Sequence, residues 1–339
     1  MSALLPARER LVDPFGRIIT YVRLSVTDRC DFRCLYCMPK DAVFLPKAGV
    51  LSLEELQRLG ETLIDLGIDK IRITGGEPLV RRGIMTLFRA LGARIGDGGL
   101  SELTLTTNGS QLSQFAKGLY QAGVRRINVS LDSLKAETFE AIARPGKFDD
   151  VMAGIGAAEK AGLKIKINTV ALKDINDAEI PDILRWCGER GFDLSLIEAM
   201  PVGEVDGRRS QHYLPLPKVK EALERAFTLE ETDYRTAGPS RYFRVRETGR
   251  RIGFITPLSH KFCETCNRVR VTCTGRMYMC LGQNDHADLR TPLRASEGNG
   301  LLKAAIREAI ARKPEQHFFE KAAERGEAAV ARTMNVTGG

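Results

Sequence analysis

The chain has 339 residues, of which 43% are hydrophobic and 28% charged, with a formal net charge of +8. This composition can bury a core, which excludes a largely disordered chain. No apolar run approaches the roughly 18–20 residues that cross a bilayer, and Met1 to Arg17 do not form a signal-peptide pattern. We therefore expect a globular cytoplasmic protein. The diffuse positive charge suits a phosphate-rich small molecule or a nucleic acid.

From about residue 20, short β-branched runs alternate with amphipathic stretches. The runs predict strands at 21–26, 70–74, 103–107, 126–131, 164–170 and 193–197. The stretches between them predict helices at 53–66, 83–95, 111–121, 149–161 and 178–190. The first helix has the clearest boundaries, because Ser52 and Glu55 form a capping-box pattern and Gly67 follows its end.

Six β-α repeats predict an α/β fold with a parallel sheet covered by helices. They are too few for a closed eight-fold barrel, so we expect an open, partial (β/α)6 barrel that resembles a TIM barrel. An open doubly wound sheet is the alternative. Because Pro and Gly cluster between residues 201 and 217, we expect the barrel to occupy 1–204.

A smaller second region is expected over 205–332, followed by a tail at 333–339. In it we predict strands at 242–246 and 251–256, an irregular Cys-rich segment at 263–280, and helices at 301–311 and 314–331. We expect this region to cover the open side of the barrel.

Three cysteines lie on the loop that closely follows the first predicted strand. Cys30, Cys34 and Cys37 have the spacing C-x3-C-x2-C, on a loop of the kind that builds active sites in β/α barrels. Structural disulfides are unusual in a reducing cytosol. Three thiolates can hold three irons of a [4Fe–4S] cluster and leave the fourth iron open to a small molecule. A zinc knuckle is the alternative, but zinc usually takes a fourth protein ligand, and none lies nearby.

A second group of cysteines lies in the Cys-rich segment. Cys263, Cys266 and Cys280 have the spacing C-x2-C-x13-C, with Cys273 between them. One interpretation is a zinc module with four Cys ligands, or with three Cys and His260. The other is a second [4Fe–4S] cluster with an open iron, held without Cys273. In an extended strand Arg268 and Arg270 project to the same face, where two guanidinium groups suit a polyphosphate.

These motifs together resemble a known family. The first Cys loop with the aromatic Tyr36, and Gly-Gly-Glu-Pro at 75–78, resemble the radical S-adenosylmethionine (SAM) superfamily. With Asn-Val-Ser-Leu-Asp at 128–132, the motif C-x2-C-x-R-x-R-x9-C and the terminal Gly338-Gly339, the chain resembles the GTP 3′,8-cyclases from about residue 15 to its end.

The resemblance implies an enzyme, a radical SAM lyase with two [4Fe–4S] clusters. Its 5′-deoxyadenosyl radical would abstract the ribose 3′ hydrogen of GTP, and the C3′ radical would attack guanine C8. The product would be (8S)-3′,8-cyclo-7,8-dihydroguanosine 5′-triphosphate, made in the first step of molybdenum cofactor biosynthesis.

The resemblance also implies the residues of the site. The first cluster would be held by Cys30, Cys34 and Cys37, and the second, whose open iron would bind the guanine edge, by Cys263, Cys266 and Cys280. The SAM site would be lined by Tyr36, Gly76, Ser130 and Met200. GTP would contact Arg23, Arg72, Thr106, Lys166, Arg268, Val269 and Arg270. The catalytic set would comprise Arg268, Arg270, Gly338 and Gly339, with the glycine tail threading into the active site.

The implied partners are a flavodoxin- or ferredoxin-type electron donor and, downstream, cyclic pyranopterin monophosphate synthase. Neither nucleic acid nor a membrane is expected as a partner, and the sequence allows a homodimer. Two rival interpretations remain. A radical enzyme that modifies a peptide would have a wide groove and no nucleotide clamp. A zinc-stabilised RNA-binding protein would bind zinc, and its RNA affinity would be sensitive to salt.

Overall fold

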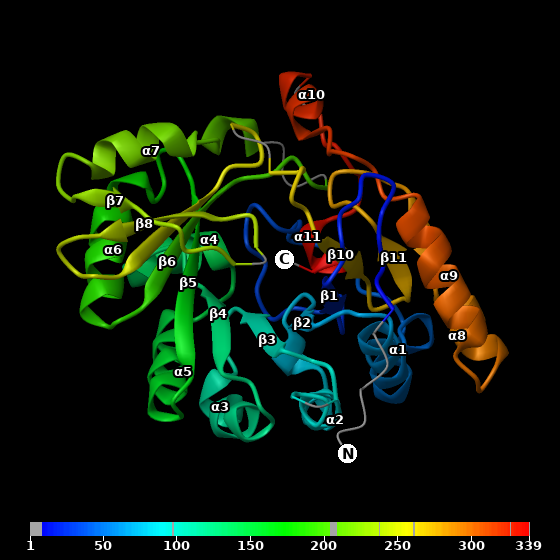
Figure 1. Cartoon of the computed structure of the whole chain (residues 1–339). Helices are drawn as coiled ribbons and strands as arrows, with labels where there is room; N and C mark the ends of the chain where they lie inside the picture. Colours follow the sequence, from blue (N-terminus) through cyan, green and yellow to red (C-terminus); the bar gives the residue numbers. More distant parts are fainter. Residues whose placement is uncertain are drawn as a thin grey trace, which may run out of the picture.

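The computed structural model describes residues 9–96, 98–203, 209–236, 238–259, 262–325 and 327–338. Across these ranges, every helix is too short or too polar to cross a bilayer. Figure 1 shows a curved sheet with helices outside it and the C-terminal end of the chain near its middle.

The core of the fold is one twelve-stranded sheet in the order β12-β11-β10-β1-β2-β3-β4-β5-β6-β9-β8-β7. Its six central strands are parallel neighbours in chain order. They are β1 (Tyr21–Ser25), β2 (Lys70–Thr74), β3 (Glu102–Thr107), β4 (Arg126–Ser130), β5 (Lys164–Ala171) and β6 (Asp193–Glu198). Because the order never reverses, every crossover runs the same way, and the sheet curves into the predicted open barrel rather than a doubly wound sheet.

Helices alternate with these strands and cover the outer face of the barrel (Figure 1). They are α1 (Leu53–Asp65), α2 (Ile84–Gly92), α3 (Leu112–Gln121), α4 (Ala136–Ala143), α5 (Phe148–Lys160) and α6 (Ile180–Glu189), with short 3-10 turns η1 (Lys47–Gly49), η2 (Pro78–Val80) and η3 (Asp177–Glu179). The capping box of α1 is present as predicted, and Gly67 follows the helix with a φ of +96°. Helix α4 was not predicted.

The second half of the chain extends both edges of the same sheet. Strands β9 (Arg251–Ile255), β8 (Arg241–Val245) and β7 (Leu229–Glu231) continue from β6, and strands β10 (Arg268–Val271), β11 (Arg276–Tyr278) and β12 (His286–Asp288) continue from β1. The joins β6–β9 and β1–β10 are parallel. The remaining elements are η4 (Arg209–His212), α7 (Leu216–Leu223), α8 (Arg290–Ala295), α9 (Gly300–Ala311), α10 (Phe319–Glu324) and α11 (Met334–Thr337).

Two predictions in this half are wrong. The segment 263–280 is not irregular throughout, because it contains β10 and β11. The helix expected over 314–331 is limited to α10. In a helix, the carbonyls of Pro314 and Glu315 would accept hydrogen bonds from backbone amides four residues later. Here they accept hydrogen bonds from Arg17 instead. Near the far end of the segment, Val330 forms a β-bridge with Val202.

Candidate active site

A single cavity inside the curved sheet collects the predicted site residues. Those that line it are Arg23, Cys30, Cys34, Tyr36, Cys37, Arg72, Gly76, Thr106, Ser130, Lys166, Met200, Cys263, Cys266, Arg268, Val269, Arg270 and Cys280. Gly338 reaches this group through Arg270, and Gly339 lies outside the described residues. Residues that are far apart in the sequence therefore share one space.

The first Cys trio (Cys30, Cys34 and Cys37) lies on the loop after β1. A side chain from the loop after β3 anchors it, because the Asn108 amide donates to the Cys30 Sγ (3.8 Å) and to the Asp31 carboxylate (2.7 Å). The Ser110 hydroxyl donates to the other oxygen of Asp31 (2.6 Å). Sequence reasoning missed Asn108 and Ser110, although their place just after a predicted strand could have indicated them.

The chemistry of this trio fits a cluster. Burial raises the pKa of the Cys34 thiol, and the nearby Cys37 and Cys30 raise it further, so three thiolates here need cationic partners. Within the described part of the chain, no three His, Cys, Asp or Glu side chains converge as one metal ion would require. A [4Fe–4S] cluster fits, because each thiolate binds a different iron.

The turn that carries Gly76 packs tightly on the first Cys loop. The Gly76 amide donates to the Thr27 carbonyl (2.8 Å), and the next amide, of Glu77, donates to the Arg29 carbonyl (2.8 Å). A side chain at Gly76 would overlap the Arg29 carbonyl. The glycine is therefore required for this close approach.

Tyr36 is fixed from the opposite wall of the cavity. Its hydroxyl donates to an Asp132 oxygen (2.7 Å), and the other Asp132 oxygen accepts from the Val170 amide (2.8 Å). Burial raises the pKa of Asp132 to about 6, although both hydrogen bonds oppose the rise. Asp132 therefore ties the first Cys loop to β5.

The second Cys trio (Cys263, Cys266 and Cys280) lies at the base of the β10–β11 hairpin. Cys263 and Cys266 precede β10, and Cys280 follows β11. Burial raises the pKa of the Cys266 thiol, but the charges of Arg268 and Lys313 outweigh it and lower the pKa to about 7. Cys273 lies between the two strands and is not among the residues that line the cavity. His260, the alternative ligand, lies outside the described residues.

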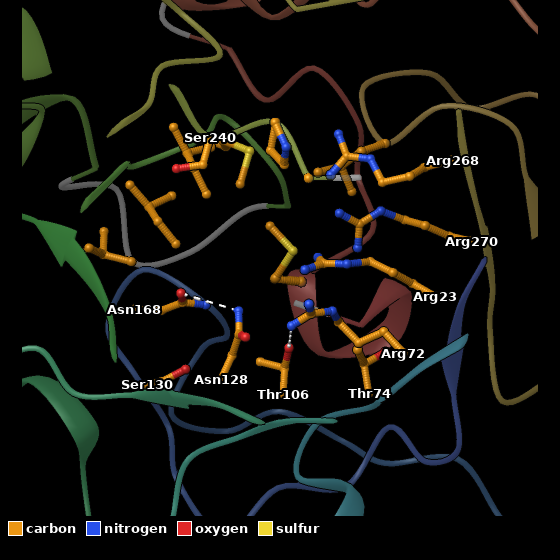
Figure 2. A pocket seen from close by; sticks show the side chains of 18 of the residues that line it. Arg23, Arg72, Thr74, Thr106, Asn128, Ser130, Asn168, Ser240, Arg268 and Arg270 are labelled. Atoms are coloured by element: carbon orange, nitrogen blue, oxygen red, sulfur yellow. Dashed lines mark hydrogen bonds between the residues drawn. The ribbon is translucent and has the colours of Figure 1, made fainter. Parts of the chain in front are cut away.

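Seven Arg and Lys side chains line the same cavity. Lys70 and Arg126 pair with Glu102, and the five others are Arg23, Arg72, Lys166, Arg268 and Arg270. Arg72, Arg23 and Arg270 occupy matching positions on three neighbouring strands, β2, β1 and β10. Their guanidinium groups stack along one side of the cavity together with that of Arg268 (Figure 2).

These cations have no acidic partner among the described residues, where no carboxylate forms an ion pair with any of the five. Burial, followed by the charges of Arg23 and Arg268, lowers the pKa of Arg270. Such a group of like charges, of which Arg72 and Lys166 are buried, favours an anionic ligand.

Two tyrosines that sequence reasoning missed partly compensate these charges. The Tyr21 hydroxyl accepts from Arg72 (2.6 Å) and from Arg23 (3.4 Å), and the Tyr242 hydroxyl accepts from Lys166 (3.1 Å). Burial raises the pKa of Tyr21, but Arg72 and Arg23 outweigh it and lower the pKa to about 6. Tyr21 could have been found, because it lies two residues before Arg23 on the same strand face. No local signal indicates Tyr242.

The C-terminal segment enters the site beside the first Cys loop. The Asn335 amide donates to the Asp28 carbonyl (3.0 Å), and the backbone amide of Met334 donates to the Cys37 carbonyl (3.4 Å). At the end of α11, the Gly338 carbonyl accepts a hydrogen bond from Arg270. The tail therefore contacts both the first Cys loop and the cation group.

Comparisons with known proteins agree with this geometry. The pattern of the family described as "Radical SAM superfamily" matches residues 24–187, and that of "Molybdenum Cofactor Synthesis C" matches residues 192–319. A Rhizobium etli protein named GTP 3′,8-cyclase is 62% identical over 338 residues, which are 100% of this chain and 97% of that protein. A Mesorhizobium japonicum protein of the same name is 59% identical over 329 residues, or 97% and 99% of the two chains.

A solved structure shares the fold. It is the crystal structure of Streptococcus suis SuiB bound to S-adenosylmethionine, with a TM-score of 0.58 and 16% identity, covering 95% of this chain and 78% of that one. At this identity the likeness concerns the fold alone.

The open barrel and the match to the radical SAM superfamily identify the chain as a radical SAM enzyme. The high identity over nearly the whole length narrows this class. The chain belongs to the GTP 3′,8-cyclase family, and its cofactors are SAM and two [4Fe–4S] clusters.

Proposed function

We propose that the Cys trios, the cations and the C-terminal tail each have a separate role in the family's reaction. The chain converts GTP to (8S)-3′,8-cyclo-7,8-dihydroguanosine 5′-triphosphate, the first step of molybdenum cofactor biosynthesis. One observation carries the assignment: two Cys trios and five cations without carboxylate partners line the same cavity. SAM bound at the first cluster would supply the 5′-deoxyadenosyl radical that takes the ribose 3′ hydrogen. After C3′ bonds to guanine C8, one further electron, from the electron donor proposed below, and one proton would complete the dihydro product.

The first Cys trio holds the cluster that binds SAM, and the second Cys trio holds the cluster that faces guanine. Tyr36, Gly76, Ser130 and Met200 line the SAM side. Support comes from their place in the same cavity and from the hydrogen bond that fixes Tyr36 on Asp132. Because Tyr36 is held in place, it restricts the position at which the radical forms. This suits a reaction that must remove one particular ribose hydrogen.

The five cations bind the triphosphate. The Thr106 hydroxyl accepts from Arg72 (3.1 Å) and so orients that guanidinium group, and Val269 contributes through its backbone between Arg268 and Arg270. Arg268, Arg270 and the glycine tail act together at the reacting nucleotide, because Arg270 already holds the Gly338 carbonyl.

We also propose the partners. Reductive cleavage of SAM needs an electron, which a flavodoxin- or ferredoxin-type donor would supply, and cyclic pyranopterin monophosphate synthase would consume the product. None of the eight cysteines forms a disulfide, which suits the reducing cytoplasm. The proposal includes no nucleic acid or membrane. The homodimer stays a prediction, which light scattering would test.

The first test is the composition of the anaerobically reconstituted chain. We expect about eight irons and eight sulfides per chain with negligible zinc, as two cubane clusters require. With SAM and GTP deuterated at C3′, deuterium should appear in 5′-deoxyadenosine, and a cyclised triphosphate should form. Four irons with one zinc, or deuterium that stays on GTP, would contradict the proposal.

A variant pair tests the cation group. Arg23→Met should raise the KM for GTP about tenfold or more, because a charge-assisted hydrogen bond contributes about 1.5–3 kcal/mol. Its matched control is Arg246→Met, because Arg246 is exposed at the end of β8 and pairs with Glu230 (2.7 Å). An equal KM in both variants would show that the triphosphate binds elsewhere.

A further inference from the structure

Lys313, just after α9, lies behind the second Cys trio and does not line the cavity. Helix α9 runs beside the β10–β12 side of the sheet (Figure 1), and Lys313 follows the end of this helix by two residues. Its exposed fraction is only 2%. No part of the proposed reaction so far uses this side chain.

The Lys313 ammonium group joins both ends of the hairpin. It donates to the Arg268 carbonyl (2.9 Å) at the start of β10 and to the Met279 carbonyl (2.6 Å), directly before Cys280. Its third contact is the Cys266 Sγ, at 3.7 Å. One group therefore holds the backbone beside two of the three cysteines and also contacts a sulfur.

A second cation fixes the remaining cysteine. The Arg17 guanidinium donates to the Cys263 carbonyl (2.8 Å) and also to the carbonyls of Pro314 (2.6 Å) and Glu315 (2.7 Å). Asp13 holds Arg17 in place through an ion pair (2.5 Å). Arg17 thus connects the segment after Lys313 to the loop of the second Cys trio.

The charges around Lys313 indicate which group its ammonium stabilises. Arg17 has Asp13, but within the described residues no carboxylate pairs with Lys313. A buried ammonium without a counter-charge is costly. The nearest group that can become anionic is the second Cys trio, whose thiolates carry the negative charge once they hold a cluster.

We propose that Lys313 is a positioning residue for the second cluster, which it stabilises and whose reduction potential it raises. The proposal rests on the second Cys trio holding a [4Fe–4S] cluster. Partners outside the ligand set orient ligands and typically change metal affinity 10- to 100-fold. A hydrogen bond to a ligand sulfur and a nearby positive charge both favour the reduced, more negative cluster.

The test compares Lys313→Met, which keeps the length but loses the charge and the donors, with the reconstituted wild-type chain. We expect the variant to lose iron from the second cluster to a chelator about tenfold faster. The midpoint potential of that cluster, followed by electron paramagnetic resonance, should shift to more negative values. The first cluster should keep its potential, because Lys313 does not contact the first Cys trio.

Two further variants sharpen the result. Lys313→Arg keeps the charge and should restore most of the potential, whereas Lys303→Met removes a half-buried lysine of α9 that pairs with Asp65 and should change neither quantity. The melting temperature of Lys313→Met, relative to that of the wild type, is measured for both the cluster-free and the reconstituted chain. This comparison separates a general loss of stability from the proposed role. We expect the larger destabilisation in the reconstituted chain.

The proposal is overturned if the potential and the iron-release rate of Lys313→Met equal those of the wild type, or if both forms of the chain lose the same stability. A wild-type chain that takes up only four irons would instead refute the second cluster itself, so the two failures are distinguishable.

Discussion

Gly338 shows how much of the proposed site depends on one residue. Its φ is +76°, in the left-handed region, and a side chain there would overlap the Thr74 hydroxyl. Within the described residues, that hydroxyl is buried without a hydrogen-bond partner. The tail can therefore end against β2 only because position 338 has no side chain.

Gly338→Ala should leave both clusters and SAM cleavage intact but reduce the cyclised product strongly. A left-handed alanine costs about 1–2 kcal/mol, and the overlap with Thr74 adds to this, so the tail should leave Arg270. The measurement is 5′-deoxyadenosine and cyclised product from the same reaction.

Gly156→Ala is the matched control. Gly156 lies in α5, and a side chain there would meet nothing within 4 Å. This variant should be as active as the wild type and slightly more stable, because alanine favours a helix. Normal product from Gly338→Ala would refute a role for the docked tail.

Strand β1 shows how one element serves both core and site. Val22 and Leu24 are fully buried in the hydrophobic core, whereas Tyr21 and Arg23 face the cavity. The strand itself was predicted from the short apolar run at 21–26. The pairing of Arg23 with Arg270 could not be predicted, because it depends on a parallel join between strands almost 250 residues apart.

Tyr21→Phe should remove a tyrosinate that forms near pH 6. In the cluster-free chain, the ultraviolet absorbance of the wild type should show this tyrosinate at pH 8, and the variant should lack it. Tyr213→Phe is the control, because burial raises the pKa of Tyr213 to about 12, so its removal should leave the signal at pH 8 unchanged.

The same shift predicts how stability depends on pH. The pKa of Tyr21 falls from an ordinary 10.0 to about 6, so the folded chain favours the phenolate. Its contribution is complete above pH 10, declines as the pH falls, and is absent below about pH 6. The melting temperature of the wild type relative to Tyr21→Phe should therefore rise from pH 6 to pH 9. A constant difference would contradict the phenolate.

At the scale of the whole molecule, Arg58 on α1 connects the barrel to the C-terminal helices. Its guanidinium donates to the Asn299 side chain (2.8 Å) and to the carbonyls of Leu293 (2.9 Å), Ser296 (2.6 Å) and Gly298 (2.7 Å). The two halves therefore share side-chain contacts as well as one sheet.

Arg58→Ala should destabilise the chain by about 1–3 kcal/mol, because several charge-assisted hydrogen bonds are lost together. Thermal unfolding measures the loss, and the iron content should not change, since Arg58 contacts neither Cys trio. Arg185→Ala removes an exposed arginine that pairs with Asp182 in the same helix and lies over the Phe227 ring, and it should change stability by less than about 1 kcal/mol. Equal melting temperatures would show that the halves do not depend on this contact.

The sequence by itself determined the parallel barrel and the two Cys trios, because periodicity and cysteine spacing are local properties of the chain, and its resemblance to a known family implied the cofactors. Only the tertiary structure decided which distant residues meet. The β1–β10 join brings Arg270 beside Arg23, and folding of the segment after α9 brings Lys313 onto Cys266. Such contacts depend on how strands and loops pack across the whole sheet, which no short stretch of sequence encodes.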